Sequence, residues 1–269
     1  MDDRLPISVL LLARDEAPRL AALLPRLAFA REVVVVVDAA SGDGTRAVAE
    51  RAGARVFERA LDGFGPQRQF GLERCREEWV LWLDADELLD LEAIESLRRA
   101  VESAGVAGYR WLRRTWFLGR PILHCGWSGE RVLRLFRRDA ARFDDAPVHE
   151  RVWVQGPVRD LRGVIEHRSY ESWADCRDKL WRYAAAGAEQ ARRRGRRASA
   201  VDVVVRPWLR FLRMYVLQLG LLDGARGAAL CALAAAQVFL KYADLWSGGL
   251  SPSNPRNPEA PPPGRGERP

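Results

Sequence analysis

The sequence predicts an α/β fold, with a doubly wound and mostly parallel sheet followed by a C-terminal helical extension. Short apolar runs alternate with helical patterns through the first 90 residues, and this alternation indicates right-handed βαβ units. Five consecutive valines, at 33–37, have the character of a strand buried on both faces of a parallel sheet. From Trp173 onward the pattern becomes helical.

The expected strands are short and rich in apolar or β-branched residues: 7–12, 33–37, 55–58 and 79–83, then 109–113, 131–136 and 152–154. The expected helices carry apolar residues at helical spacing or end at a glycine: 20–27, 46–52, about 66–76, 207–222 and 226–246. We therefore expect an α/β domain over 1–170, with halves at about 5–90 and 105–170. A helical extension over 171–246 and a disordered, proline-rich tail over 247–269 complete the predicted organisation.

The composition fits a folded protein, with 48% hydrophobic and 29% charged residues in a chain of 269. A net charge of +7 makes an anionic partner plausible: nucleic acid, an acidic membrane or a phosphorylated substrate. The four scattered cysteines form no CxxC pair, which fits a reducing compartment. The N-terminal apolar run lacks a basic leader and a cleavage site, so it is interpreted as a strand, and a cytoplasmic location is expected.

Acidic residues follow the expected strands at the edge where doubly wound sheets bind ligands. Asp38 ends the valine strand, where a carboxylate can accept hydrogen bonds from a base or ribose; alternatively it caps a turn. The chain contains neither a Gly-x-Gly-x-x-Gly fingerprint nor a Walker loop. A nicotinamide dehydrogenase or a P-loop kinase is therefore poorly supported.

Asp84 and Asp86 flank one alanine at the end of a buried strand. Carboxylate oxygens of this kind suit Mg²⁺ or Mn²⁺, which substrate phosphates would also bind. The alternative interpretation is a solvated acidic turn that includes Glu87 and Asp90.

Three segments resemble glycosyltransferase family 2, the inverting GT-A type: Val-Val-Asp-Ala-Ala-Ser-Gly-Asp-Gly-Thr at 36–45, Gly-Pro-Gln-Arg-Gln-Phe-Gly at 65–71 and Trp-Leu-Asp-Ala-Asp-Glu at 82–87. Four later segments are similar to the lipopolysaccharide core β-glucosyltransferase-like group: Leu-Phe-Arg-Arg-Asp at 135–139, Pro-Val-His-Glu-Arg at 147–151, Glu-His-Arg-Ser-Tyr at 166–170 and Gly-Leu-Leu-Asp-Gly at 220–224. The resemblance covers roughly 5–246. Ala39-Ala40 departs from the Ser-Gly that the family often has there.

The resemblance implies transfer of a sugar from a nucleotide diphosphate donor, with the donor in the first half of the domain and the acceptor in the second. It assigns five side chains to the nucleotide sugar: Arg14, Glu16, Asp38, Arg68 and Asp84. Asp38 would read the base, and Arg68 would approach the diphosphate. Asp84 would contact ribose or a metal-bound water, whereas Asp86 would be the main metal ligand.

A metal that bridges both phosphates stabilises the charge on the leaving group. Inversion also requires a base on the opposite face of the sugar. Glu150 is the preferred base, and Asp145, with Asp144 beside it, is the rival. His149 would be a third metal ligand or would orient Glu150, unless it is hydrogen-bonded in a turn. His167 is interpreted as structural.

Five arginines within 192–197 precede the apolar C-terminal helices and suit an anionic membrane surface. A solvated face, or recognition of phosphate on the acceptor, would explain them equally. The apolar runs at 228–236 and 238–240 are interpreted as too short for a membrane span. We therefore expect peripheral attachment to the cytoplasmic face of the inner membrane.

The predicted function is transfer of a hexose, glucose from UDP-glucose by resemblance, onto lipopolysaccharide core or a related glycolipid. The same chemistry on a capsule, exopolysaccharide or polyprenyl-linked acceptor is the alternative. A second alternative, from another functional class, is a catalytically inactive basic module that binds a membrane surface or nucleic acid. Nucleic acid is not expected as a partner, because the strand-end carboxylates would repel a phosphodiester backbone.

Overall fold

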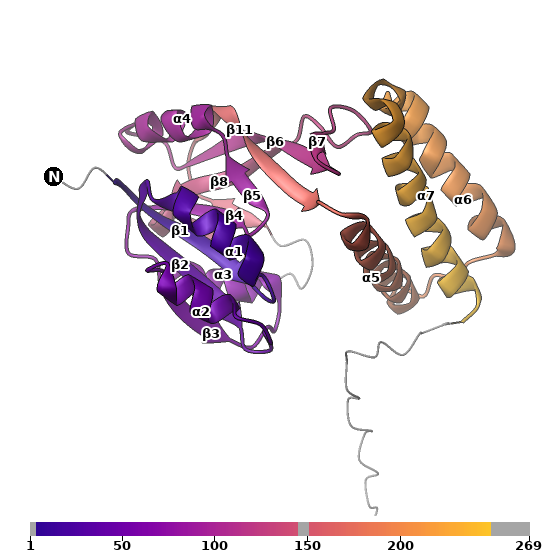
Figure 1. Cartoon of the computed structure of the whole chain (residues 1–269), viewed down its shortest axis with the longest axis horizontal. Coiled ribbons are helices and arrows are strands. Elements are labelled where there is room, and N and C mark those ends of the chain that lie inside the picture. Colours follow the sequence, from indigo (N-terminus) through magenta and orange to yellow (C-terminus); the bar gives the residue numbers. More distant parts are fainter. Residues whose placement is uncertain (1–3, 145–150, 249–269) are drawn as a thin grey trace, which may run out of the picture. The chain divides into compact units, whose positions relative to one another are not determined.

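The computed structural model describes residues 4–144 and 151–248. The chain divides into two compact units, the first ending at Glu171 and the second beginning at Ser172 (Figure 1). Three predicted site residues, Asp145, His149 and Glu150, lie outside the described residues, as does the predicted tail from 249 onward.

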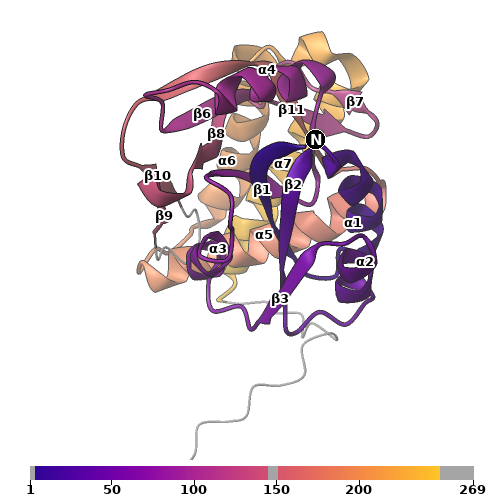
Figure 2. The ribbon, with the colours of Figure 1, turned by 90° about the vertical axis from the view of Figure 1, so that its left-hand side faces the viewer.

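Four parallel strands form the first half of the sheet in the order β3-β2-β1-β4. Their bounds are β1 Leu5–Ala13, β2 Ala30–Asp38, β3 Arg55–Arg59 and β4 Trp79–Asp84. The connecting elements are α1 Ala17–Leu23 with the turn η1 Leu24–Leu27, α2 Thr45–Arg51 and α3 Phe64–Leu72. Figure 2 shows α1 and α2 on one face of the sheet and α3 on the other. The predicted doubly wound α/β sheet is confirmed.

The valine strand is buried on both faces. Val35 and Val37 belong to the apolar cluster that contains the leucines of α1, whereas Val34 and Val36 belong to the cluster beside α3. All four side chains are at most 3% exposed. Because alternate side chains of a strand point to opposite faces, an all-valine run fills both cores at once.

The second half of the sheet continues from β4 in the order β8-β6-β11-β5. Its strands are β5 Glu87–Leu89, β6 Gly108–Phe117, β7 Arg120–Pro121, β8 Arg131–Arg137 and β11 Val158–Tyr170. The turn η2, Arg138–Ala140, follows β8. A separate two-stranded sheet consists of β9 Ala141–Phe143 and β10 Val152–Val154. β8 is antiparallel to both β4 and β6, and β11 is parallel to β6 but antiparallel to β5.

Strands were predicted at three of these places, namely β6, β8 and β10, and each is present. Three elements are not predicted from the sequence: β11, β5 and the helix α4, Leu91–Val101. The aspartate before α4 is its N-cap, since Asp90 Oδ1 accepts a hydrogen bond from the Ala93 nitrogen at 2.8 Å. Asp90 is therefore not part of a solvated acidic turn.

The second unit contains α5 Trp173–Arg193, α6 Ala200–Leu212, the π-helical turn η3 Arg213–Leu217, the short η4 Gly220–Asp223 and α7 Gly224–Trp246. The predicted start at Pro207 is wrong, because α6 begins at Ala200 and Pro207 lies inside it. The cause is a capping box in which Ser199 and Asp202 satisfy each other's backbone nitrogens.

The apolar runs at 228–236 and 238–240 were expected to be too short for a membrane span, but the helix that contains them is long enough. The helical segment Gly220–Trp246 has 27 residues and is largely apolar, so its length and composition would allow it to cross a membrane. Gln237 interrupts the apolar runs but does not end the helix.

Candidate active site

Asp38, the last residue of β2, is 6% exposed and has its carboxylate fixed by three groups. Its Oδ2 accepts a hydrogen bond from Arg14 Nη1 at 3.1 Å. Its Oδ1 accepts from the backbone nitrogens of Ala40, at 3.1 Å, and Leu61, at 3.3 Å. One oxygen thus holds the loops after β2 and β3 together, and the other orients an arginine that is half exposed.

Asp84, the last residue of β4, lies at the same edge of the sheet. It is opposite Leu12 of β1, which is itself opposite Val36 of β2. Two strand spacings separate β4 from β2, about 10 Å. Asp38 and Asp84 therefore flank the carboxyl end of β1, as the sequence predicted for a ligand-binding edge.

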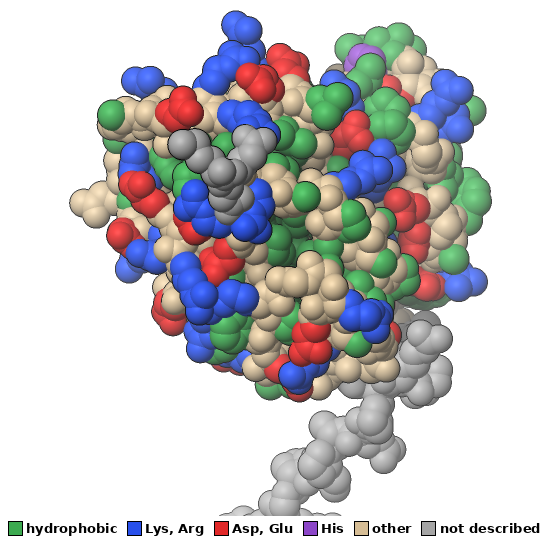
Figure 3. Space-filling model, turned by 60° about the vertical axis from the view of Figure 1, so that its left-hand side comes forward, with side chains coloured by type: hydrophobic (Ala, Val, Ile, Leu, Met, Phe, Trp, Pro, Cys, Tyr) green, Lys and Arg blue, Asp and Glu red, His purple; other side chains and the backbone are tan. Residues whose placement is uncertain are grey.

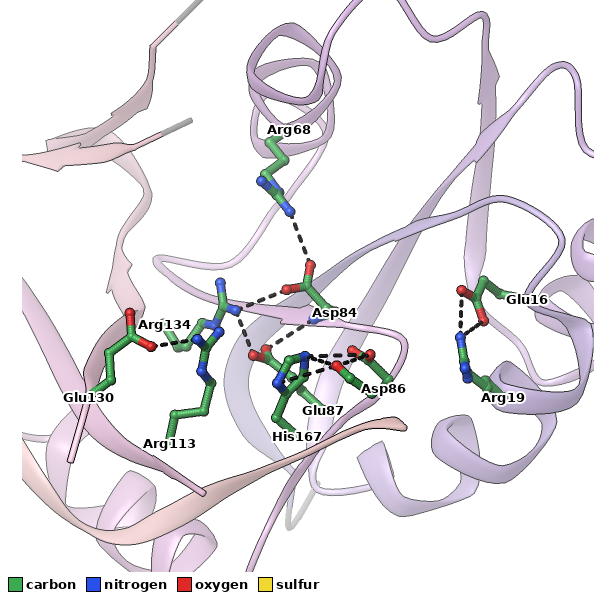
Figure 4. A network of polar contacts seen from close by, with 11 residues as sticks. Glu16, Arg19, Arg68, Asp84, Asp86, Glu87, Arg113, Glu130, Arg134 and His167 are labelled. Carbon is green, nitrogen blue, oxygen red and sulfur yellow. Dashed lines mark hydrogen bonds and ion pairs between the residues drawn. The ribbon is translucent and has the colours of Figure 1, made fainter. Parts of the chain in front are cut away.

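Two arginines hold Asp84 from different elements, and we call them the arginine clamp. Arg68 of α3 donates from Nη2 to Asp84 Oδ1 at 3.1 Å, and Arg134 of β8 donates from Nη2 to Oδ2 at 2.9 Å (Figure 4). Arg134 is 4% exposed and also donates to Glu87 Oε1 at 2.6 Å. Glu87 is completely buried, so the alternative of a solvated acidic turn is wrong here as well.

The charges of this cluster shift its pKa values in opposite directions. Burial alone would raise the pKa of Asp84, but Arg134 and Arg68 lower it below its ordinary value. Burial raises the pKa of Glu87 more than its ion pair with Arg134 lowers it. Asp84 is therefore held as the carboxylate.

An indole packs against both guanidinium groups of the clamp. The Arg68 and Arg134 guanidinium carbons lie 4.2 and 4.0 Å from the ring centroid of Trp82. Such contacts contribute about 0.5–2 kcal/mol each. Gly71 brings the arginine of α3 close to the sheet, since a Cβ at this position would lie 2.4 Å from Leu10 Cδ1.

Asp86 lies beside His167, which β11 carries to this point. Asp86 Oδ2 is 3.5 Å from His167 Nε2 and accepts a hydrogen bond from Ser169 Oγ at 3.0 Å. The position of His167 is set by the antiparallel pairing of β11 with β5, in which it lies opposite Glu87. Figure 4 shows the imidazole and the Asp86 carboxylate pointing toward one another.

Within residues 4–144 and 151–248, no three His, Cys, Asp or Glu side chains are placed together to hold a metal ion. Asp86 Oδ2 and His167 Nε2 both lie against Ser169 Oγ, at 3.0 and 2.5 Å, so an ion held by these two residues would take the place of this hydroxyl. Mg²⁺ and Mn²⁺ sites in nucleotide enzymes commonly use one or two protein ligands, with phosphates and water completing the shell. The two residues fit such an ion, whereas both oxygens of Asp84 are engaged by the clamp.

The predicted donor residues thus fall into separate groups. Arg14 lies with Asp38, and Arg68 lies with Asp84. Glu16 is bound to Arg19 of α1 at 2.9 and 3.0 Å, and Figure 4 shows this pair apart from the Asp84 cluster.

Two residues of this cluster are not among the predicted site residues. Arg134 is one of them, although an arginine between Leu133 and Leu135 in the middle of a strand is a usable signal. His167 was interpreted as structural, and only the pairing of β11 brings it to Asp86.

The chain matches the family model "Glycosyl transferase family 2" over residues 8–151. It is 29% identical to the "Lipopolysaccharide core biosynthesis glycosyltransferase LpsC" of Rhizobium meliloti (strain 1021), over 90% of this chain and 95% of that protein. It is 24% identical to an uncharacterized glycosyltransferase of Rickettsia prowazekii (strain Madrid E), over 92% of this chain and 89% of the relative.

Two solved structures resemble the fold more distantly. One is glucosyl-3-phosphoglycerate synthase from Mycobacterium tuberculosis in complex with Mn²⁺, UDP and glucosyl-3-phosphoglycerate, with a TM-score of 0.41 and 18% identity over 60% of this chain and 71% of that one. The other is S. aureus TarS 1–349, with a TM-score of 0.42 and 15% identity over 88% and 91% of the two chains.

The family match begins within β1 and includes β2, β3, β4, the arginine clamp and the Asp84-Ala85-Asp86 segment, and it covers more than half of the chain. The sheet, with helices on both faces and a second half of mixed parallel and antiparallel pairing, has the GT-A architecture that the resemblance implied. The protein is therefore a glycosyltransferase and belongs to glycosyltransferase family 2.

Proposed function

We propose that the enzyme transfers a hexose, glucose from UDP-glucose, onto the lipopolysaccharide core or a related cell-surface glycolipid. The acceptor class rests on similarity to the lipopolysaccharide core enzyme of Rhizobium meliloti, which extends over nearly the full length of both chains. The observation that carries the proposal is the shared edge at which Asp38 and the Asp84–Asp86 cluster flank β1.

A nucleoside diphosphate fits the polarity of this edge. Asp38 would accept hydrogen bonds from the base, with Arg14 beside it, and a separation of about 10 Å leaves room for the ribose between the two groups. Arg68 would face the diphosphate, and Arg134 would keep Asp84 oriented. Charged donors fixed before the substrate arrives need no reorganisation when the leaving group becomes more negative.

A divalent cation, Mg²⁺ or Mn²⁺, would be held by Asp86 together with His167 or His149. When bound, it would supply Lewis-acid stabilisation of the departing nucleoside diphosphate. Glu150 would take the proton of the acceptor hydroxyl, with Asp145 as its rival. Inversion requires this base on the face of the sugar opposite the diphosphate.

A basic module for nucleic acid is less well supported. On the face shown in Figure 3, basic and acidic side chains are interspersed instead of forming one positive field. The strand-end carboxylates would also repel a phosphodiester backbone. We propose instead that the enzyme acts at the cytoplasmic face of a membrane, where a lipid-linked acceptor is found.

Slow donor hydrolysis tests the proposal without knowledge of the acceptor. The purified chain with Mn²⁺ should hydrolyse UDP-glucose faster than UDP-galactose, UDP-N-acetylglucosamine, GDP-mannose and ADP-heptose. Asp38→Ala should abolish the preference for the uridine nucleotide, because the base would lose its partner. Hydrolysis of none of these donors above the rate without enzyme would contradict the proposal.

A further inference from the structure

One helix of the second unit exposes an apolar stripe. Side chains exposed to solvent recur along α6 at intervals of three and four residues, which places them on one side of the helix: Val201, Val204, Val205, Trp208, Leu209 and Leu212. These six residues are called the α6 stripe. Val203 is buried instead, and α6 packs against α7, which runs beside it (Figure 1). The stripe is therefore not the face that α6 uses for packing within its own unit.

The segment that follows α6 directly in the chain, formed by η3 and η4, exposes further apolar side chains. Its exposed side chains, called the leucine turn, are 44–78% accessible: Val216, Leu217, Leu219, Leu221 and Leu222. Surface turns are normally made of glycine, proline and small polar residues. A contiguous apolar surface of this kind marks an interaction site.

Arginines border the stripe along the same helix. Arg206 and Arg210 of α6, with Arg213 at the start of η3, recur at intervals of four and three residues, on the side of the helix adjacent to the stripe. Asp202 pairs with Arg206 at 2.6 Å. The arginine run at 192–197 lies just before α6. An apolar helix face edged by arginine matches the boundary between acyl chains and headgroups, because arginine can bury its stem while its guanidinium stays among phosphates.

We infer that the α6 stripe and the leucine turn together dock onto a lipid bilayer containing anionic headgroups, with the helix lying in the interface. Apolar area would supply most of the attraction, and the bordering arginines would select anionic lipid. The inference rests on the proposed action at a membrane face and identifies the surface responsible, and it does not depend on which donor or acceptor the enzyme uses.

The packing of α7 favours this mode over a membrane span. Arg192 of α5 binds Asp244 of α7 at 2.7 Å, and the Arg206 guanidinium lies 4.8 Å from the Tyr242 ring of α7. α5 packs along α7 and carries charged residues through much of its length. If α7 crossed the bilayer in this arrangement, α5 would bring those charges into the hydrocarbon, which is strongly unfavourable.

Co-sedimentation of the full chain with vesicles tests the inference. The wild type should bind vesicles of phosphatidylcholine with phosphatidylglycerol, and it should bind phosphatidylcholine alone more weakly. The double variant Trp208→Glu/Leu217→Glu should lower the partition coefficient at least about tenfold, since both side chains leave the apolar phase. Unchanged circular dichroism and thermal midpoint would show that this variant is folded.

Matched controls come from the first unit, which also exposes a tryptophan and a leucine. Trp153 is 55% exposed and Leu91 is 87% exposed, against 65% for Trp208 and 78% for Leu217. Trp153→Glu/Leu91→Glu should bind vesicles like the wild type. If both double variants lose binding equally, the effect is one of net charge and the inference is wrong.

Three further outcomes would overturn it. The wild type could remain in the supernatant with both kinds of vesicle. It could bind neutral and anionic vesicles equally, which would remove the requirement for anionic lipid. It could form a dimer by light scattering that Trp208→Glu/Leu217→Glu dissociates, without binding vesicles; a second copy of the chain would then cover this surface.

Discussion

Arg134 Nη2 lies 2.9 Å from Asp84 Oδ2, and this ion pair joins the two halves of the sheet at the site. The arginine comes from β8 and the aspartate from β4, which are antiparallel neighbours. The same nitrogen donates to the fully buried Glu87 at 2.6 Å. One guanidinium therefore compensates two carboxylates and fixes the segment that carries Asp86.

Replacing Arg134 by methionine should destabilise the protein strongly. The change leaves Glu87 buried without its ion pair, which costs about 3–5 kcal/mol in free energy of unfolding. Urea denaturation would measure it. Arg131→Met, at the exposed end of the same strand and paired with Asp160, should cost no more than about 1 kcal/mol. If Arg134→Met does not fold, the double variant Arg134→Met/Glu87→Gln should recover stability, because no buried charge is then left unpaired. Equally small losses of stability in Arg134→Met and Arg131→Met would contradict the role of Arg134 in compensating Glu87.

The two carboxylates held by Arg134 should show opposite pH dependence. Burial raises the pKa of Glu87, so its contribution to stability is present below about pH 4.3 and is lost as the pH rises through its folded-state pKa. The arginines lower the pKa of Asp84, so its contribution is present above about pH 3.9 and is lost as the pH falls.

The stability deficit of Glu87→Gln relative to wild type should therefore shrink as the pH rises, and that of Asp84→Asn should grow. Urea titrations between about pH 3 and pH 7 would follow both variants. A deficit that changes in the same direction for both would show that the two pKa shifts have been assigned wrongly.

Gly71 should not tolerate a side chain. A Cβ there would lie 2.4 Å from Leu10 Cδ1 and 3.0 Å from a methyl group of Val36, so α3 would have to move off the sheet. Gly71→Ala should cost about 1–3 kcal/mol by urea denaturation and should weaken UDP binding by displacing Arg68. The control is Gly42→Ala, where no atom lies within 4 Å of the new carbon, and it should change neither the free energy of unfolding nor UDP binding. If Gly71→Ala also leaves both unchanged, the close approach of α3 to the sheet is easily relieved.

The parallel half of the sheet could be predicted because its signals are local. A stretch of a few residues is enough to recognise each of three features: the valine run, the turn after Asp38 and the apolar strand before Asp84. β11 could not be predicted in this way, because charged residues and Gly163 interrupt its apolar pattern and its stability comes from pairing with β6 and β5.

The residues of the candidate site differ in the same way, because some are recognisable from the sequence around them and others depend on long-range strand pairing. Asp84 and Asp86 can be found from their spacing at the end of a buried strand, whereas Arg68 follows only from the family resemblance. Arg134 is 50 residues from Asp84 along the chain, and it reaches the site only because β8 pairs with β4. His167 likewise depends on the return of β11 beside β5, a long-range pairing that no short motif encodes.

Glu150→Gln should abolish sugar transfer and leave UDP binding unchanged, because a neutral amide cannot accept the acceptor proton. A general base contributes about 10²–10⁴-fold to the rate. Transfer assays paired with UDP titrations would separate the two effects. Asp145→Asn should retain activity; if it abolishes transfer while Glu150→Gln does not, the base is Asp145.

The most direct test concerns Asp86 and the cation. Thermal unfolding of the wild type should shift upward when UDP and Mn²⁺ are added together, and less with either alone, because bound ligand stabilises the folded state. Asp86→Ala should lose this joint shift, and His167→Asn should weaken it, whereas Asp139→Ala, at a position 83% exposed, should keep it in full. A joint shift that survives in Asp86→Ala, or is absent from the wild type, would contradict a metal-assisted diphosphate site at the end of β4.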